Sequence, residues 1–329
     1  MRAIRLHEFG PAENLRSETV ADPVPGDGQV RIAVKAGGVH LIETWLRGGT
    51  PVGPHPLPQL PITPGGEVAG IVDALGPGAD EALLGKRVVA SLDGDGGYAE
   101  LAVAEASAVH EIPEGLDFGA AVAMVTTGTT ALSILEIAEL RSSDVVVVTA
   151  AAGGIGALLV QAARGIGATV VAAAGGARKV VRAGELGAQL AIDYNVDGWT
   201  GTVAEKLNGR RVTVVLDGVG GETALAAYGL LSDGGRVVSF GAASDGGDVP
   251  MSASELESRG IAFQSLFTAP IMAELQDPAA ARNLQHRALE SAVDELKPVV
   301  QTFPLADAAA AHRALESRQT MGKVVLVTD

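Results

Sequence analysis

The segment that most constrains the fold of this chain is residues 145–156, which read VVVVTAAAGGIG. Four consecutive valines predict a strand buried on both faces, as in the interior of a parallel sheet. Three glycines follow, and a helical pattern then occupies residues 157–164. Glycines at such a turn permit a sharp bend and the close approach of a pyrophosphate, which the N–H groups of the helix N-terminus bind. The segment predicts a phosphate-binding strand–turn–helix unit, with a purely structural tight turn as the alternative.

Apolar segments that alternate along the following residues predict a doubly wound parallel sheet, and therefore an α/β fold. A long apolar helix over residues 120–140, interrupted by the sequence TTGTT at 126–130, precedes the sheet. The strands are predicted at 145–149, 169–174, 190–193, 212–217, 235–241 and 261–267, and the intervening helices at 155–164, 178–186, 199–207 and 222–230.

The remaining residues predict a second, β-rich domain, and a length of 329 residues also favours two domains. Six prolines in residues 51–64 predict an extended loop, which serves either in packing or as the wall of a pocket. A strand at 323–327 has no partner nearby in the sequence, so we expect it to return to the first domain. This domain is predicted to comprise residues 1–120 and 270–329 and to be discontinuous, with the dinucleotide-binding domain at 121–269. Its strands are predicted at 29–34, 66–75, 86–91 and 98–103, with late helices at 278–295 and 307–318.

Charge and cysteine content exclude several classes of function. With 24 basic and 39 acidic side chains the net charge is −15, which argues against nucleic acid and anionic membranes as partners. The chain has no cysteine, so disulfides, thiolate zinc sites and a cysteine nucleophile are excluded. The N-terminus lacks a signal-peptide pattern, and the longest apolar run is shorter than a membrane span. We expect a cytoplasmic, soluble protein.

The residues after the second strand indicate which dinucleotide binds. An acidic residue about twenty positions beyond the first glycine selects NAD by binding the ribose 2′-hydroxyl. Here those positions hold Ala173, Ala174 and Gly175, and the next turn brings the cations Arg178 and Lys179. Cations at a helix N-terminus oppose the macrodipole unless an anion binds there. The pattern favours NADP(H), whose extra phosphate would meet these cations; the alternative is a solvated first helical turn.

Five motifs make the chain similar to the medium-chain dehydrogenase/reductase superfamily, and in particular to its zinc-independent quinone oxidoreductase branch, which includes zeta-crystallin. The similarity covers essentially the whole length. It implies a GroES-like catalytic domain, a Rossmann domain, a cleft between them, and a homodimer formed through the edge strand near residues 261–267. The motifs are AAAGGIG at 150–156, GGVHLIETWLR at 37–47, PGGEVAG at 64–70, LGAQLAIDY at 186–194 and GKVVLV at 322–327.

The resemblance also implies the residues that bind the cofactor. Lys179 and Tyr194 match contacts to the 2′-phosphate, and Gly175 stands where relatives often have serine or threonine. Arg318 matches a late cationic contact to phosphate. The full set of expected cofactor-binding residues is Thr130, Gly153, Gly154, Ile155, Gly156, Gly175, Arg178, Lys179, Tyr194, Val219, Phe240, Gly241 and Arg318.

On the substrate side the chain departs from the family. Zinc-containing relatives have a cysteine at the position of His40 and a His-Glu pair at Gly66-Glu67, so two potential ligands remain and we expect no metal. Quinone reductases usually have asparagine at His40 and tyrosine at Trp45. We expect His40 either to donate a proton or only to hydrogen-bond the ribose or a loop carbonyl. Trp45 either walls the substrate or packs, and Glu67 is expected to pair with a nearby cation.

These residues predict an enzyme that transfers a hydride from NADPH to a quinone or a related conjugated carbonyl. One alternative is an enone or enoyl reductase that saturates a C=C bond. An alternative of another class is a cofactor-binding protein with a structural or regulatory role and little turnover. The expected partner is a small quinone or enone substrate.

Overall fold

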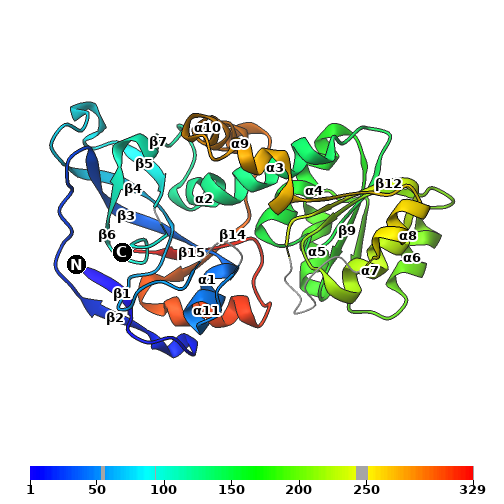
Figure 1. The fold of residues 1–329 in the computed structure, drawn as a ribbon, viewed down its shortest axis with the longest axis horizontal. Helices are drawn as coiled ribbons and strands as arrows, with labels where there is room; N and C mark the ends of the chain where they lie inside the picture. The colour runs from blue at the N-terminus through cyan, green and yellow to red at the C-terminus, as the bar shows by residue number, and fades with distance from the viewer. Residues whose placement is uncertain (53–55, 93, 242–250, 329) are drawn as a thin grey trace. The chain divides into compact units, whose positions relative to one another are not determined.

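The computed structural model describes residues 1–52, 56–92, 94–241 and 251–328. The chain forms two compact units (Figure 1). The first contains Met1–Gly128, Gln285–Asp294 and Pro298–Asp329, and the second contains Thr129–Leu284 and Glu295–Lys297. The divisions at Gly128 and Gln285 fall inside helical segments. They lie later in the chain than the boundaries expected at 120 and 270.

The second unit is built on a six-stranded parallel sheet in the order β10-β9-β8-β11-β12-β13. This confirms the doubly wound sheet. Val145 and Val147 of the central strand β8 pack on the side of α6 and α7, whereas Val146 and Val148 are buried on the other side. The strands are β8 (Val145–Val148), β9 (Thr169–Ala174), β10 (Leu190–Asp193), β11 (Val212–Asp217), β12 (Leu231–Ser239) and β13 (Ala262–Ser265). The helices are α3 (Thr129–Ala138), α4 (Gly154–Ile166), α5 (Ala177–Glu185), α6 (Trp199–Lys206), α7 (Gly221–Gly229), α8 (Ala253–Ser258) and α9 (Pro270–Glu274).

Two of these strands differ from the predicted bounds. The strand expected at 235–241 begins earlier and ends at Ser239, which leaves Phe240 and Gly241 in the connection after it. The strand expected at 261–267 is only Ala262–Ser265, because a 3₁₀ turn, Leu266–Thr268, ends it.

The first unit is β-rich and contains a seven-stranded sheet in the order β14-β15-β3-β4-β5-β7, with β6 paired to β3. Strand β15 lies antiparallel to β3 and parallel to β14, which confirms that the last strand returns to the N-terminal domain. Its strands are β3 (Gln29–Val39), β4 (Glu67–Leu75), β5 (Arg87–Ser91), β6 (Leu101–Glu105), β7 (Val109–Glu111), β14 (Val300–Pro304) and β15 (Lys323–Val327), with a separate pair β1 (Arg2–Leu6) and β2 (Leu15–Thr19). The helices are α1 (Leu41–Gly48), α2 (Phe118–Ala123) and α11 (Ala308–Glu316); α10 (Pro278–Asp294) ends in this unit.

The apolar helix expected at 120–140 is continuous but irregular. Between α2 and α3 the residues Met124–Gly128 form a π-helical turn, and the predicted TTGTT interruption overlaps it. The whole segment, Phe118–Ala138, is long and apolar enough to cross a membrane by length and composition, but 61% of its most apolar window is buried inside the protein. Such burial is typical of a core helix of a soluble protein.

Candidate active site

The glycine turn after β8 packs closely against the start of α4, and only glycine permits this approach. A Cβ on Gly156 would lie 2.3 Å from the carbonyl oxygen of Ala150, so no other residue fits without moving the backbone. The N–H of Ala151 donates to the carbonyl of Ala173, at 3.1 Å, which ties the turn to β9. Helix α4 begins at Gly154 and has no acidic residue in its first turn. Its N-terminal N–H groups and partial positive charge are therefore suited to an anion.

A second group of predicted residues follows β9 and β10. Gly176, at φ 94°, precedes α5, whose first turn contains the exposed Arg178 and the half-buried Lys179 and no acidic residue. The structure explains why Gly175 replaces serine or threonine: a Cβ there would lie 3.0 Å from Cε2 of Tyr194 and 3.1 Å from its hydroxyl. The phenol therefore takes the space that a longer side chain would fill.

An acidic residue also lies in this group, although not at the end of β9. Asp193 Oδ1 accepts hydrogen bonds from the N–H groups of Gly176 (2.9 Å) and Asn195 (3.0 Å). These bonds hold the connection after β9 against the connection after β10. The carboxylate brings negative charge close to α5, so the cations Arg178 and Lys179 have to offset it for an anion to bind there.

A third group follows β11 and β12, and sequence reasoning missed the residue that organises it. Asp217 is buried and accepts hydrogen bonds from Thr149 Oγ1 (2.7 Å), the N–H of Val219 (3.1 Å) and the hydroxyl of Tyr228 (3.2 Å). Burial and this carboxylate raise the pKa of Tyr228, so the phenol remains a donor. An acidic residue that ends an apolar strand before Gly-Val-Gly-Gly was the available signal. Asp217 fixes the turn that carries Val219.

Phe240 packs over the same turn. A Cβ on Gly218 would lie 2.5 Å from the Phe240 ring, and one on Gly241 would lie 3.0 Å from the carbonyl oxygen of Gly218. Because the strands are parallel, the connections after β8, β9, β10, β11 and β12 lie along one edge of the sheet, where open α/β sheets bind ligands. The structure thus brings most of the predicted cofactor residues to one edge: Gly153, Gly154, Ile155, Gly156, Gly175, Arg178, Lys179, Tyr194, Val219, Phe240 and Gly241. Thr130 belongs to the same unit, in the first turn of α3, whereas Arg318, His40 and Trp45 belong to the other.

In the first unit, a buried hydrogen-bonded chain fixes the start of α1, where His40 precedes the first helical turn. The Glu43 carboxylate accepts from the His40 N–H at 2.8 Å and from the Tyr98 hydroxyl at 2.6 Å. Burial and the Glu43 charge raise the pKa of Tyr98 well above its ordinary value. The Tyr98 hydroxyl also lies 3.1 Å from Nε2 of the buried His312, whose pKa burial lowers to about 3. The backbone position of His40 is therefore set by the Glu43 carboxylate, which the Tyr98 phenol holds in place.

The side chain of His40 meets two buried ions. Glu67, at the start of β4, is 0% exposed, and its Oε1 lies 2.5 Å from Nζ of Lys323 and 3.0 Å from Nε2 of His40. Lys323, at the start of β15, is also buried, and its Nζ lies 2.9 Å from the same Nε2. Burial alone would raise the pKa of Glu67, but the basic His40 and Lys323 side chains outweigh it and lower the pKa. The expectation that Glu67 pairs with a cation is confirmed, with Lys323 as the partner.

This arrangement does not fit a catalytic zinc ion. The ammonium group of Lys323 stands within 3 Å of both potential ligands, where a metal bridging His40 and Glu67 would have to lie. Among the residues that the structure describes, no three histidine, cysteine, aspartate or glutamate side chains form a group able to hold a metal. Zinc needs three protein ligands in catalytic sites and four in structural ones.

The proline-rich loop walls a cavity, so of its two expected roles the structure supports the second. Its described residues Pro56, Pro58 and Pro64 line a space of about 260 Å³ together with Glu43, Leu46 and Arg47 of α1. These three lie on one face of the helix, and the helical period places Trp45 on the opposite face. Trp45 is not among the described residues that line the cavity.

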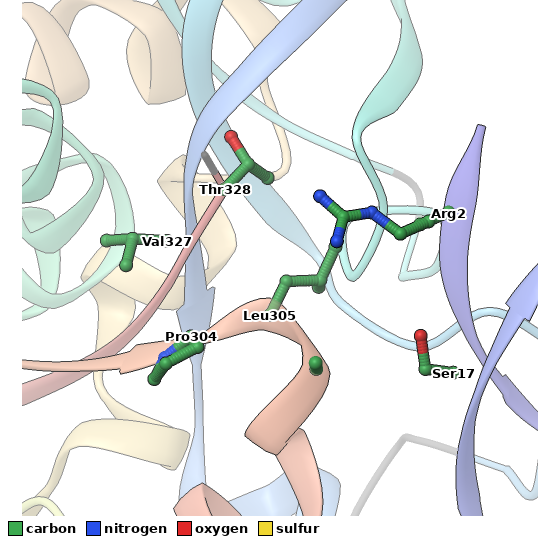
Figure 2. Close-up of a pocket in the computed structure, with 7 residues that line it drawn as sticks. Arg2, Ser17, Pro304, Leu305, Val327 and Thr328 are labelled. Carbon is green, nitrogen blue, oxygen red and sulfur yellow. The ribbon is translucent and has the colours of Figure 1, made fainter.

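A second hollow of about 50 Å³ lies between Arg2, Ser17, Pro304, Leu305, Val327 and Thr328 (Figure 2). It has room for one or two water molecules. None of the predicted site residues lines it.

Comparison with known proteins agrees with this geometry. Residues 26–114 match the alcohol dehydrogenase GroES-like domain family, and residues 186–326 match the zinc-binding dehydrogenase family. A 2-haloacrylate reductase of Burkholderia sp is 32% identical over 98% of this chain and 97% of its own length. The quinone oxidoreductase of Sus scrofa is 31% identical over 99% and 98%. The Escherichia coli quinone oxidoreductase, solved in complex with NADPH, is 28% identical with a TM-score of 0.86, over 99% of this chain and 100% of that one.

One matched family carries zinc binding in its name, but this chain has no cysteine to act as a zinc ligand. The relatives match nearly the whole chain, and both the GroES-like and the Rossmann architecture are present. The chain belongs to the zinc-independent quinone oxidoreductase branch of the medium-chain dehydrogenase/reductase superfamily.

Proposed function

We propose that this protein reduces a quinone, or a related conjugated carbonyl compound, with a hydride taken from NADPH. The observation that carries the proposal is the glycine turn after β8. Its Gly156 leaves no space for a Cβ beside the Ala150 carbonyl, and it opens onto the N-terminus of α4. Relatives named quinone oxidoreductase, one of them solved with NADPH, support the same reaction.

The residues at the sheet edge are proposed to bind the cofactor in parts. The N–H groups of Gly154, Ile155 and Gly156 bind the pyrophosphate, and Thr130 lies near it. Arg178, Lys179 and Tyr194 bind the 2′-phosphate, because two cations and a phenol can donate to it. Val219, Phe240 and Gly241 wall the nicotinamide side, and Arg318 adds a cationic contact. When bound, NADPH supplies a hydride from C4 of its nicotinamide. This division of roles makes the second unit the NADP(H)-binding domain and the first the catalytic domain.

We propose that His40 supplies the proton and that Trp45 walls the acceptor. A quinone is already electrophilic, so it needs no metal to accept a hydride, and the protein has mainly to position it and exclude water. The His40 backbone is fixed by Glu43, and the His40 side chain is 25% exposed. His40 is therefore both positioned and accessible, as a proton donor has to be.

The test is NADPH consumption by the purified protein with a panel of quinones and enones. Turnover of at least one class is expected. NADPH binding without turnover of any acceptor would instead support a cofactor-binding protein with a structural or regulatory role. His40→Asn should lower kcat for weakly activated acceptors and leave NADPH affinity unchanged, whereas an unchanged pH–rate profile would contradict the proton-donor role.

Reduction of a C=C bond is the second candidate. The 2-haloacrylate reductase is as similar to this chain as the quinone oxidoreductases are, and its name implies reduction of a conjugated acid. Hydride addition to such a substrate leaves a carbon, rather than an oxygen, to be protonated. Product analysis separates the two: an enone substrate yields a saturated ketone by this route, whereas a quinone yields a hydroquinone.

We also propose that the protein acts in the cytoplasm, where NADPH is supplied, as a homodimer. Strand β13 is at the edge of its sheet, and Phe267 in the turn after it is 67% exposed. Among the described strands β13 pairs only with β12, and a strand edge of this kind beside an exposed aromatic side chain favours association. Light scattering should give a dimer mass for the wild type and a monomer mass for Phe267→Glu; a monomeric wild type would contradict the proposal.

A further inference from the structure

The carboxylate of Asp217 is buried among neutral hydrogen-bond donors. Asp217 is the last residue of β11 and is 1% exposed. Its Oδ1 accepts from Thr149 Oγ1 at 2.7 Å and from the N–H of Val219 at 3.1 Å. Its Oδ2 accepts from the N–H of Gly220 and from the hydroxyl of Tyr228, both at 3.2 Å. Among the residues that the structure describes, none pairs this carboxylate with a cationic side chain.

These bonds require the ionised form of the carboxylate. Both oxygens act as acceptors, so a proton on either one would displace a donor that is already in place. The Thr149 hydroxyl accepts from the N–H of Gly218 at 2.9 Å, which leaves its own proton for Asp217. The N–H groups and the nearby N-terminus of α7 stabilise the negative charge. Because these groups are dipoles without net charge, the charge of the carboxylate still acts over distance.

The strand order places Asp217 on the nicotinamide side of the sheet edge. The cations Arg178 and Lys179, proposed to bind the 2′-phosphate, follow β9. A dinucleotide crosses such a sheet at the point where the strand order reverses, which here lies between β8 and β11. The nicotinamide half is therefore expected beside β11 and β12. Phe240 covers the turn after Asp217, since a Cβ on Gly218 would lie 2.5 Å from its ring. An apolar cover of this kind weakens solvent screening of the carboxylate.

We infer that the buried charge of Asp217 stabilises the positive charge that develops on the nicotinamide ring, and so makes bound NADPH a stronger hydride donor. Resting on the proposed function, the inference names what favours loss of the hydride. When the C4–H bond breaks, both of its electrons leave with the hydrogen to the acceptor, and a proton completes the reduction. The neutral dihydronicotinamide thereby becomes a pyridinium cation. A fixed negative charge lowers the free energy of the cation and not that of the neutral ring.

The alternative is that Asp217 only holds the turn that carries Val219. A purely structural role would affect the binding of NADPH and of NADP⁺ equally, because both forms need the same turn. A charge distinguishes them, because only NADP⁺ carries the positive ring. Two unit charges about 10 Å apart at an effective dielectric constant of about 20 change an equilibrium constant on the order of 10-fold.

The direct test is the ratio of the dissociation constants of NADP⁺ and NADPH, each measured by calorimetric titration without an acceptor. Asp217→Asn removes the charge at nearly constant size, and its amide still accepts from Thr149 and donates to the Tyr228 hydroxyl. This variant should weaken NADP⁺ binding on the order of 10-fold more than NADPH binding. An equal loss for both forms, or no loss for either, would overturn the inference and leave Asp217 a structural residue.

Two control variants separate the charge from the hydrogen bonds. Tyr228→Phe removes one donor and keeps the carboxylate, so the ratio should stay within about twofold of the wild type. Glu222→Gln removes an exposed negative charge from the first turn of α7. Solvent and salt screen that charge, so this ratio should also stay within about twofold. A change in either control as large as that of Asp217→Asn would overturn the inference.

The wild type gives a second measurement, which decides the question if Asp217→Asn does not fold. NADP⁺ should bind to it more tightly than NADPH, because the site favours the cation; tighter binding of NADPH would overturn the inference.

Kinetics separate the inference from the proposed function. With an acceptor that the wild type reduces, Asp217→Asn should lower kcat by less than it changes the binding ratio, because only part of the charge has developed in the transition state. If no quinone or enone is reduced but the ratio changes as expected, the proposed reaction fails while the effect of the Asp217 charge is supported.

Discussion

Gly156→Ala is the sharpest test of the phosphate turn, because one methyl group meets backbone that cannot rotate away. The added Cβ would lie 2.3 Å from the Ala150 oxygen, 2.9 Å from its carbonyl carbon and 3.0 Å from the Ala151 Cα. Ordinary contacts begin near 3.4 Å, so the turn or the start of α4 has to shift by about 1 Å. Overpacking of this kind costs about 1–3 kcal/mol. A 1 Å displacement of the N–H groups should weaken NADPH binding by about 10- to 100-fold.

The assay is fluorescence titration of NADPH, accompanied by thermal unfolding. Gly165→Ala is the matched control, because it lies in the same helix and a Cβ there meets nothing within 4 Å. It should raise stability by up to about 1 kcal/mol through helix propensity and leave NADPH binding unchanged. If Gly156→Ala binds NADPH as the wild type does, the turn does not hold the pyrophosphate and the reasoning is refuted.

Three other changes test separate parts of the structure. Lys179→Ala should weaken NADPH by about 10-fold and NADH hardly at all; equal losses would contradict the 2′-phosphate assignment. Glu67→Ala leaves Lys323 buried without its carboxylate partner, and it should lower the free energy of unfolding, measured by urea titration, by about 3–5 kcal/mol. A loss below about 1 kcal/mol would contradict this and mean that water reaches the Lys323 ammonium group. Burial and the charge of Arg47 lower the pKa of His312 from 6.5 to about 3. Between pH 6.5 and pH 3, therefore, His312 binds a proton in the unfolded chain but not in the folded chain. Stability should therefore fall as pH falls from 6.5 towards 3, and His312→Leu should flatten that slope in denaturation measured against pH; an identical slope would contradict the burial argument.

Elements with a local signal could be predicted from the sequence. The valines of β8, the glycines before α4 and the alternation of strands and helices each depend on neighbouring residues, and the parallel sheet follows from them. The pairing of β15 is not local, but it could still be predicted. The sequence near β15 offers no strand for it to pair with, which indicated a partner strand far away in the sequence. The 126–130 interruption was visible because threonine and glycine disfavour a regular helix.

Elements without such a signal were missed. Helix α1 has eight residues and follows directly on β3, and β1, β2, β7 and β14 are short, so their patterns are too brief to read. Gly175 stands where relatives often have serine or threonine, and only the structure shows that Tyr194 occupies the space of that side chain. The contact of Lys323 with His40 joins residues that are far apart in sequence, and no spacing rule predicts it. Asp217 was overlooked because a carboxylate after a buried strand is common, and only its burial and donors mark it.

Calorimetric titration of the purified wild-type protein with NADPH and with NADH tests the central claim most directly. The account predicts one NADPH per chain, bound more tightly than NADH, because backbone N–H groups hold the pyrophosphate and Arg178, Lys179 and Tyr194 bind the extra phosphate. Uptake of neither dinucleotide would contradict it.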